Sequence, residues 1–386
     1  MILVVIVLTV ACVPEEGGGP DVPAPVLMGY LPTKVLAGSQ LVLIGEGFVP
    51  LEEGFQALHM DGSAGGRMIN VTVPVRYLDE GEDAGNLVWD VDASFLSVVE
   101  PGGEPFLGRI SVLRLLHDRD GGGSGTDTKS LDELESERRS LAWIASDRRV
   151  RSNQLDAVIH TAASLTPEVS GLDAQEVWLG DRVRVTGGNW LAPGEGLTLA
   201  WLDGVFTQDS PPKALQVNSL VVPLEVQSRT EAYLDLSPEV FGIRPGTFQG
   251  SLRVVNSAIS GVEKESEVSG DVILQLMPTY VETVSPSLVR RGQRVAVTGR
   301  GFLEADTDLE TVTLLLLSGI FTTLDGKEMD LTGYNSITVF PDTVPDNGLL
   351  DVVLRVVEGI DGELEGFGLV PGTFSGKVSV ELFHGT

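Results

Sequence analysis

The sequence is poor in cysteine, histidine, aromatic residues and positive charge. Its 386 residues include one cysteine and four histidines, and aromatic residues make up 6%. A single cysteine excludes a disulfide within one chain. The histidines are His59, His117, His160 and His384. They form no H-x-x-x-H pair and no Cys/His cluster of the zinc-binding kind, so the sequence gives no sign of a transition-metal site.

The charge is strongly one-sided, with 26 Lys and Arg against 55 Asp and Glu, a net charge of −29. Such a surface repels nucleic-acid phosphate and anionic lipid, so we expect no nucleic-acid partner. Hydrophobic residues make up 42% of the chain, which is enough to build cores and argues against disorder. The excess of carboxylates leaves open a second interpretation, in which they bind divalent cations.

The apolar run at the start of the chain, residues 2–10 of "MILVVIVLTVAC", is too short to span a bilayer as a permanent helix. It is typical of a secretory signal, and the small residue Ala11 precedes Cys12. The segment resembles a bacterial lipoprotein signal. That resemblance implies a signal peptide over 1–11, lipidation at Cys12 and a Gly/Pro-rich acidic tether over 12–25. The alternative is an apolar N-terminus with a buried thiol.

One pattern of glycines and an aromatic residue occurs three times. The aromatics are Phe48, Trp190 and Phe302; glycines lie three residues before them, at Gly45, Gly187 and Gly299, and ten before, at Gly38, Gly180 and Gly292. Between the glycines, apolar residues alternate with others at Leu41/Leu43, Val183/Val185 and Val295/Val297. Alternation of this period predicts a strand with one buried face, and three matches in register indicate a repeat.

A second anchor follows in each copy. Phe106, Phe248 and Phe374 each precede a strand whose apolar positions coincide, at Ile110/Val112, Leu252/Val254 and Val378/Val380. Short strands separated by Gly, Pro and Asp are typical of a β-sandwich. The sequence therefore predicts an all-β protein of three tandem immunoglobulin-like sandwiches with one short inserted helix.

The glycines and aromatics are expected to shape turns and cores. Glycine reaches positive φ at low steric cost, so it suits a sharp turn after a strand, and the following aromatic can cap the core. Arg300, which lies between Gly299 and Gly301, is expected to point outward, with Glu46 and Asn189 at the corresponding positions. No helix follows to bind phosphate, so the turn does not indicate a nucleotide loop.

The stretches "SPSLVRRGQRVAVTGRGF" and "PGTFSGKVSVEL" resemble the IPT/TIG family of immunoglobulin-like domains. The resemblance implies Ig-like domains over 26–117, 160–262 and 263–386, the last beginning with a connecting strand. Its motifs carry no catalytic residues. Between the first two domains, residues 118–159 are expected to hold a loop, a connecting strand and an amphipathic helix over about 130–146, packed on the first domain.

The sequence contains no motif that points to catalysis, and we expect a protein that is not an enzyme. His160 lies in an alternating strand and is expected to be structural. A calcium loop at Asp118, Asp120 and Asp127 remains an alternative, since calcium takes oxygen ligands near a glycine bend. Trp89, Trp143 and Trp201 are candidates for glycan contact, although Trp201 lies in a strand where burial is expected.

These features favour a non-enzymatic lipoprotein of the cell envelope that acts as a spacer and protein-interaction module. We expect it on the bacterial outer membrane, held through the lipid anchor and facing the periplasm or the exterior, with other envelope or surface proteins as partners. The alternatives are a calcium- or glycan-dependent surface adhesin and an accessory module of a secreted hydrolase. No cofactor is expected, with calcium as the open possibility.

The last strand, "KVSVELFHGT", has no further strand after it in the sequence. Val378, Val380 and Leu382 are expected to face the core, and Lys377, Ser379 and Glu381 to face water. An open strand edge can pair with another chain, so self-association through this edge is one expectation. The alternative is that the charged residues protect the edge, or that other strands of its own domain flank it.

Overall fold

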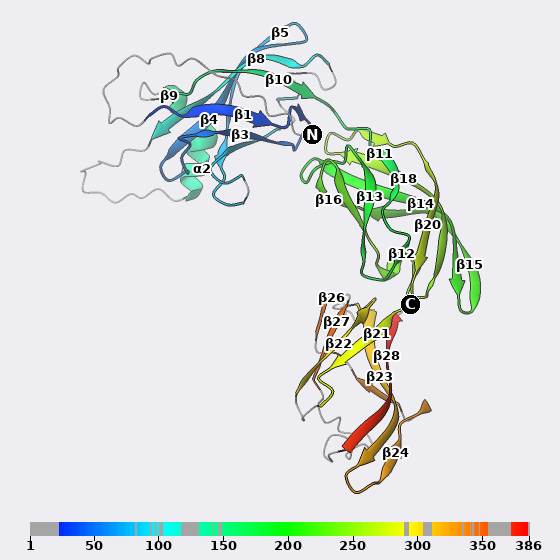
Figure 1. Cartoon of the computed structure of the whole chain (residues 1–386). Helices are drawn as coiled ribbons and strands as arrows, with labels where there is room; N and C mark the ends of the chain where they lie inside the picture. The colour runs from blue at the N-terminus through cyan, green and yellow to red at the C-terminus, as the bar shows by residue number, and fades with distance from the viewer. Residues whose placement is uncertain are drawn as a thin grey trace, which may run out of the picture. The chain divides into compact units, whose positions relative to one another are not determined.

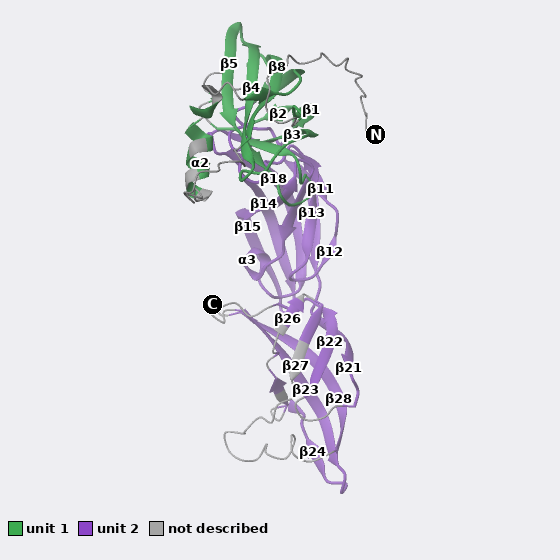
Figure 2. Ribbon diagram, turned by 90° about the vertical axis from the view of Figure 1, so that its left-hand side faces the viewer, with its two compact units in different colours: residues 1–35, 40–161 green, residues 36–39, 162–386 purple. Residues whose placement is uncertain are grey.

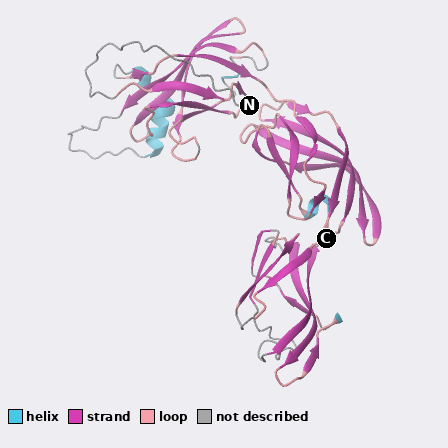
Figure 3. Cartoon of the chain, viewed as in Figure 1, coloured by secondary structure: helices cyan, strands magenta, loops and turns pink. Residues whose placement is uncertain are grey.

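The computed structural model describes residues 23–81, 83–92, 95–96, 99, 103–116, 131–140, 142–145, 149–288, 293–303, 311–333, 336–339, 341, 343–346, 348–353 and 372–384. Strands dominate this part of the chain (Figure 3). By contact the chain divides into two compact units (Figure 2): unit 1 is Met1–Val35 with Gln40–Thr161, and unit 2 is Leu36–Ser39 with Ala162–Thr386.

The first sandwich has a four-stranded sheet of order β1-β3-β7-β6 and a second sheet of order β2-β10-β8-β4-β5, with β9 also paired to β8. Its strands are β1 (Val26–Leu31), β2 (Lys34–Val35), β3 (Gln40–Glu46), β4 (Gly54–Ala64), β5 (Arg67–Pro74), β6 (Arg76–Tyr77), β7 (Leu87–Asp90), β8 (Phe106–Leu116), β9 (Val150–Arg151) and β10 (Leu155–Thr161) (Figure 1).

The second sandwich repeats this topology, with sheets of order β11-β13-β17-β16 and β12-β20-β18-β14-β15, and β19 paired to β18. Its elements are β11 (Glu168–Leu172), β12 (Glu176–Val177), β13 (Arg182–Gly188), β14 (Gly196–Asp209), β15 (Pro212–Pro223), β16 (Glu225–Ser228), β17 (Glu231–Asp235), the short helix α3 (Pro238–Phe241), β18 (Gly246–Ala258), β19 (Glu263–Glu265) and β20 (Ser269–Leu276).

The third sandwich has a sheet of order β21-β22-β27-β26 and a second in which β23 pairs with β24, β25 and β28. Its strands are β21 (Tyr280–Ser285), β22 (Arg294–Arg300), β23 (Thr311–Thr323), β24 (Glu328–Asp330), β25 (Ile337–Val339), β26 (Thr343–Asp346), β27 (Leu349–Val353) and β28 (Gly372–His384). Each sandwich consists of two sheets, and its four-stranded sheet has the same strand order in all three copies, which confirms the predicted all-β, immunoglobulin-like fold.

The alternating apolar residues form the cores. Leu41 and Leu43 of β3 have no exposed surface, and their counterparts are buried as well: Val183, Val185, Val295 and Val297. The same holds for the strands after Phe106 and Phe248, where Ile110, Val112, Leu252 and Val254 are fully buried. Because side chains on a strand alternate between faces, each strand needs only these two positions to fix which side meets the core.

Two strands that the sequence analysis assigned to connections belong to sheets. β10 pairs antiparallel with β8 over Leu155–Ile159, and β20 pairs antiparallel with β18. Ala157, Ile159, Val272, Leu274 and Leu276 are accordingly buried. The first domain boundary was expected at 159/160 and lies at 161/162. The second was expected at 262/263, which would place β20 in the third domain. Both β10 and β20 instead close a sheet of the preceding sandwich.

The inserted helix is present and packs on the first sandwich. Helix α2 (Leu131–Ser140) is followed by a 3₁₀ turn, η1 (Ala142–Ala145). Trp143 joins an apolar cluster with Phe55, Ala57 and Leu113, and the Arg138 side chain donates to the carbonyl oxygen of Val75 at 2.6 Å. Among the described residues, no helix is long and apolar enough to cross a membrane.

Candidate functional site

The three aromatics of the repeated turn lie inside the sandwiches, with exposed fractions of 8% for Phe48, 0% for Trp190 and 1% for Phe302. In each copy the ring packs on the glycine three residues earlier. A Cβ added to Gly45 would lie 2.5 Å from the Phe48 ring, and one on Gly299 would lie 2.6 Å from the Phe302 ring. Each would also collide with a carbonyl oxygen of the neighbouring strand. This first glycine is required for close approach.

The left-handed position of the turn is the residue directly before the aromatic. Gly47 has a φ of +72° and Gly301 of +80°, whereas Gly45 and Gly299 are not among the residues with positive φ. In the middle copy Asn189 takes this place with a φ of +59°, and asparagine tolerates that conformation better than most residues. The sequence analysis was therefore wrong to align Asn189 with Arg300, and it assigned the sharp turn to the wrong glycine.

The candidate ligand residues are only partly described. Cys12 and the possible calcium ligands Asp118, Asp120 and Asp127 lie outside the described residues, so lipidation and calcium binding stay predictions. Within the described part of the chain, no group of three or more His, Cys, Asp or Glu side chains could hold a metal ion.

The tryptophans differ from expectation. Trp89 is 2% exposed and Trp143 is 6% exposed, so neither offers a surface for a glycan. Trp201, expected to be fully buried, is only partly buried, because Ala200 and Leu202 on either side of it face the core. The guanidinium of Arg253 lies over its ring, 4.4 Å from the centroid.

The described histidines make structural contacts or face solvent. His160 on β10 is exposed. The Nδ1 atom of His59 lies 3.0 Å from Thr72 Oγ1, and that of His384 lies 2.9 Å from Thr311 Oγ1. Burial lowers the pKa of His59, and the positive charge of Arg151 lowers it further.

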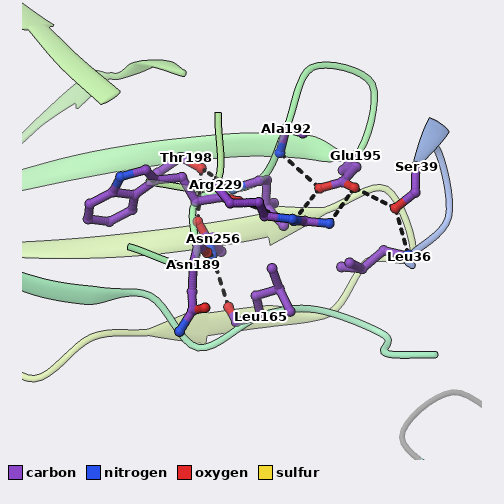
Figure 4. Close-up of polar contacts among 11 residues, drawn as sticks. Leu36, Ser39, Leu165, Asn189, Ala192, Glu195, Thr198, Arg229 and Asn256 are labelled. Atoms are coloured by element: carbon purple, nitrogen blue, oxygen red, sulfur yellow. Dashed lines mark hydrogen bonds and ion pairs between the residues drawn. The ribbon is translucent and has the colours of Figure 1, made fainter. Parts of the chain in front are cut away.

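A buried carboxylate organises one end of unit 2 (Figure 4). Glu195 is 1% exposed, and Arg229 donates to both of its oxygens, from Nη1 to Oε2 at 2.5 Å and from Nη2 to Oε1 at 2.6 Å. The backbone N–H of Ala192 donates to Oε2 at 2.8 Å, and the hydroxyl of Ser39 donates to Oε1. The carboxylate thus accepts four hydrogen bonds, two of them from a planar guanidinium.

The segment Leu36–Ser39 is held by these contacts. It lies between β2 and β3 in the chain but belongs to unit 2. The N–H of Leu36 donates to Ser39 Oγ at 2.7 Å, and the Leu36 side chain packs in a buried cluster with Ala162, Leu165, Leu191 and Ala258. Glu195 therefore fixes, through Ser39, a segment more than 150 residues away in sequence.

A second buried polar residue lies beside this cluster. Asn256 is fully buried, and its Nδ2 donates to the carbonyl oxygens of Leu165 at 2.9 Å and Asn189 at 2.8 Å. Its Oδ1 accepts from the Thr198 hydroxyl at 2.8 Å (Figure 4). Every hydrogen bond of the Asn256 amide group ends on backbone or on another buried side chain, which is the mark of a structural network.

We call these residues, Ser39, Glu195, Thr198, Arg229 and Asn256, the buried polar cluster. The carboxylate has no free side from which to act as a base, so the arrangement holds backbone segments in place. The sequence analysis missed it, because the members come from separate strands and loops. The sequence offered only a local signal: Glu195 lies in the loop "APGEG", which directly follows the repeated turn.

Arg300 makes a specific contact within unit 2. Its guanidinium carbon lies 4.6 Å from the centroid of the Trp178 ring, which also meets Tyr280 edge-on at 6.3 Å. Leu303 and Leu382 pack against the core of the second sandwich. Arg300 points outward from its own sandwich, as expected, and contacts the second one, where a cation over an indole face is stabilising by about 0.5–1 kcal/mol or more.

No protein-family model matches the chain, and no curated protein matches it either. Among solved structures, the chain is similar to the full extracellular region of plexin A4, at 11% identity over 87% of this chain and with a TM-score of 0.29. It spans 21% of that plexin chain.

Two further solved structures match at comparable levels. The FN1–FN3 domains of chicken CNTN1 match at 8% identity, covering 94% of this chain and 100% of that one, with a TM-score of 0.20. A marsupial T cell receptor matches at 10% identity, covering 86% and 93%, with a TM-score of 0.18. The immunoglobulin-like assignment therefore rests on the strand order of the three sandwiches.

Proposed function

We propose that this protein is a non-enzymatic lipoprotein of the bacterial cell envelope whose immunoglobulin-like domains, of the IPT/TIG kind, serve as a spacer and protein-interaction module. Cys12 would carry the lipid, and residues 12–25 would tether the first sandwich to the outer membrane. The partners would be other envelope or surface proteins.

The observation that carries the proposal is how the polar side chains are used. Glu195, the most buried charged side chain among the described residues of unit 2, is fully engaged in holding backbone segments. The guanidinium of Arg300 lies over the ring of Trp178 in the second sandwich. An enzyme concentrates titratable groups with free faces in a pocket. Here these groups fix turns, segments and neighbouring sandwiches, which is what a spacer requires.

The anchor is tested by membrane fractionation of cells that produce the native chain or its Cys12→Ala variant. A lipid-anchored protein sediments with membranes, whereas the variant should appear in the soluble fraction, since a tether without its acyl chains binds a bilayer poorly. Cys12→Ser serves as a matched variant that keeps a polar atom at this position. Equal membrane association of all three proteins would contradict the anchor.

The interaction role is tested by affinity capture from native envelopes, with the lipidated chain as bait. One or more envelope proteins should be enriched at a fixed ratio and lost when the bait is replaced by a bait of equal charge that lacks the three sandwiches. Turnover of a substrate by the purified chain would overturn the non-enzymatic assignment.

A further inference from the structure

In the first two sandwiches the strand after the second aromatic anchor has a partner on each side. β8 pairs with β4 and with β10, and β18 pairs with β14 and with β20. A two-residue strand then pairs parallel with β10 or β20 and ends the sheet, as β2 and β12 do. Short edge strands of this kind are a common way to keep a sheet from pairing further.

The corresponding strand of the third sandwich, β28, runs beside β23 (Figure 1), and the two pair along their whole length. Among the residues that the structure describes, no strand pairs with the other side of β28. The position that β10 and β20 fill in the first two sandwiches is therefore open in the described part of the third.

The side chains beside this position show the consequence. In the second sandwich Phe206, Phe248 and Leu274 form one row across three paired strands, and each is at most 1% exposed. In the third sandwich the row begins with Phe321 and Phe374, and Phe374 is only half-buried. The place of Leu274 has no occupant among the described residues.

The same difference appears farther along the strand. Val378 and Val380 are half-buried, whereas their counterparts Leu252 and Val254 are fully buried. The apolar core face of β28 is built as in the other sandwiches but is less completely covered.

The backbone shows what kind of group belongs there. Six residues after its anchor, Val112 accepts from the N–H of Ser152 at 2.8 Å and donates its own N–H to Ser152 Oγ at 2.9 Å. Val254 makes the same pair of bonds with Ser266, at 2.8 and 2.9 Å. Both serines are 6% exposed. A buried serine in the segment that leads from β9 to β10, or from β19 to β20, thus satisfies both peptide groups of the valine.

Val380 is the counterpart of Val112 and Val254, since it also lies six residues after its anchor, Phe374. Its N–H and C=O correspond to the groups that meet a serine in the other two sandwiches. A strand placed beside β28 would provide both recognition elements at once: a backbone to pair with residues 372–380 and alternating apolar side chains to complete the phenylalanine row.

We propose that β28 binds, in antiparallel register, an extended segment of a partner polypeptide that completes the third sandwich. The segment carries apolar residues at alternate positions, as β10 and β20 do. It also carries a serine seven or eight residues before the apolar residue that pairs with Phe374. Ser152 and Ile159, and Ser266 and Leu274, set this spacing. The inference rests on the proposed interaction role, for which it names the binding site.

The partner is a different protein rather than a second copy. Each copy carries a net charge of −29, which opposes the association of two copies.

The test uses the purified full-length chain and a fluorescent peptide with the sequence of residues 266–276, "SEVSGDVILQL", as the probe. Fluorescence anisotropy measures binding, and hydrogen exchange followed by mass spectrometry locates it. The peptide should bind saturably at one per chain and slow amide exchange at 372–384 by at least about tenfold, while exchange in β8 and β18 stays unchanged.

Two matched peptides separate strand addition from nonspecific adhesion. Exchanging Asp271 with Val272 and Leu274 with Gln275 keeps the composition but moves the apolar side chains to the other face, and should weaken binding at least about tenfold. In a second peptide, Ser266→Ala removes the hydroxyl that would accept a hydrogen bond from the N–H of Val380. This peptide should bind a few-fold more weakly than the probe.

Three results would overturn the inference. The first is equal binding, or no binding, of the probe and the face-exchanged peptide. The second is amide exchange at residues 372–384 as slow as in β18 in the free monomer, because the place would then already be filled. The third is sedimentation of the chain as a dimer with β28 protected. None of these depends on lipidation or on envelope partners, so the outcome is separate from the tests of the proposed function.

Discussion

Replacing Glu195 by glutamine should destabilise unit 2 and release the segment Leu36–Ser39. Glutamine keeps the shape of the side chain but has one acceptor oxygen in place of two. Its NH₂ group would face a donor, either Arg229 or one of the Ala192 and Ser39 donors. The Arg229 guanidinium would also lose its counter-charge in a site where Glu195 is 1% exposed.

The magnitude follows from the geometry of the pair. Removing one partner of a fully buried ion pair costs about 3–5 kcal/mol. The side chain of Arg229 is 28% exposed, and its Nη1 also donates to the Trp190 carbonyl oxygen at 3.1 Å, so it keeps some compensation. We therefore expect a loss of about 2–3 kcal/mol in the free energy of unfolding. For a cooperative unit of this size that corresponds to a melting temperature lower by about 6–9 °C.

Differential scanning calorimetry and urea unfolding of the full chain measure this loss, and hydrogen exchange at residues 36–39 reports the release of the segment. The matched control is Glu225→Gln, the same substitution in the same sandwich. Glu225 pairs with Arg182 at the surface, where both side chains are about half-exposed, and this variant should leave the melting temperature unchanged.

A double-mutant cycle separates the ion pair from other effects of the substitution. Combining Glu195→Gln with Arg229→Met removes both charges, so the double variant should be more stable than the sum of the single losses predicts. If Glu195→Gln costs no more than Glu225→Gln, or if the two losses simply add, then the pair does not hold this end of unit 2.

Two further predictions concern single positions. Gly299→Ala should cost at least about 3 kcal/mol, because its Cβ would lie 2.0 Å from the Tyr280 carbonyl oxygen and 2.6 Å from the Phe302 ring, whereas Gly270→Ala, with no atom within 4 Å, should be nearly neutral by thermal unfolding. Burial lowers the pKa of His59, so the unfolded state binds a proton more readily. Stability should therefore fall as the pH drops through about 6.5, and pH-dependent calorimetry should show a flatter profile for His59→Gln; an unchanged profile would refute this assignment.

The sequence by itself determined the repeat and the inward face of its marker strands. Val183 and Val185 alternate with polar residues, and their burial follows from the period of a strand. The three glycine–aromatic turns were visible for the same reason, since they recur at fixed spacing. The sequence was sufficient to predict a feature wherever one short segment contains all the residues that define it.

Assignments that depend on pairing partners went wrong from sequence. β20 was taken for a connection because its sequence does not state whether its hydrogen bonds go to β18 or to the following sandwich. Trp201 was expected to be buried because its strand is apolar on both faces, so hydrophobicity alone could not fix which face meets the core. The sequence also could not show why residue 45 must be glycine, because that depends on how closely the Phe48 ring approaches it.

Only the tertiary structure decided which polar residues matter. Glu195 and Arg229 are 34 residues apart, and Ser39 precedes Glu195 by 156, so no local pattern connects them. The same holds for the serines that pair with Val112 and Val254, whose role appears only once β9, β10 and β20 lie beside their neighbours. Sequence period sets which side of a strand is apolar, whereas the contacts between strands, which span long sequence separations, set what each side meets.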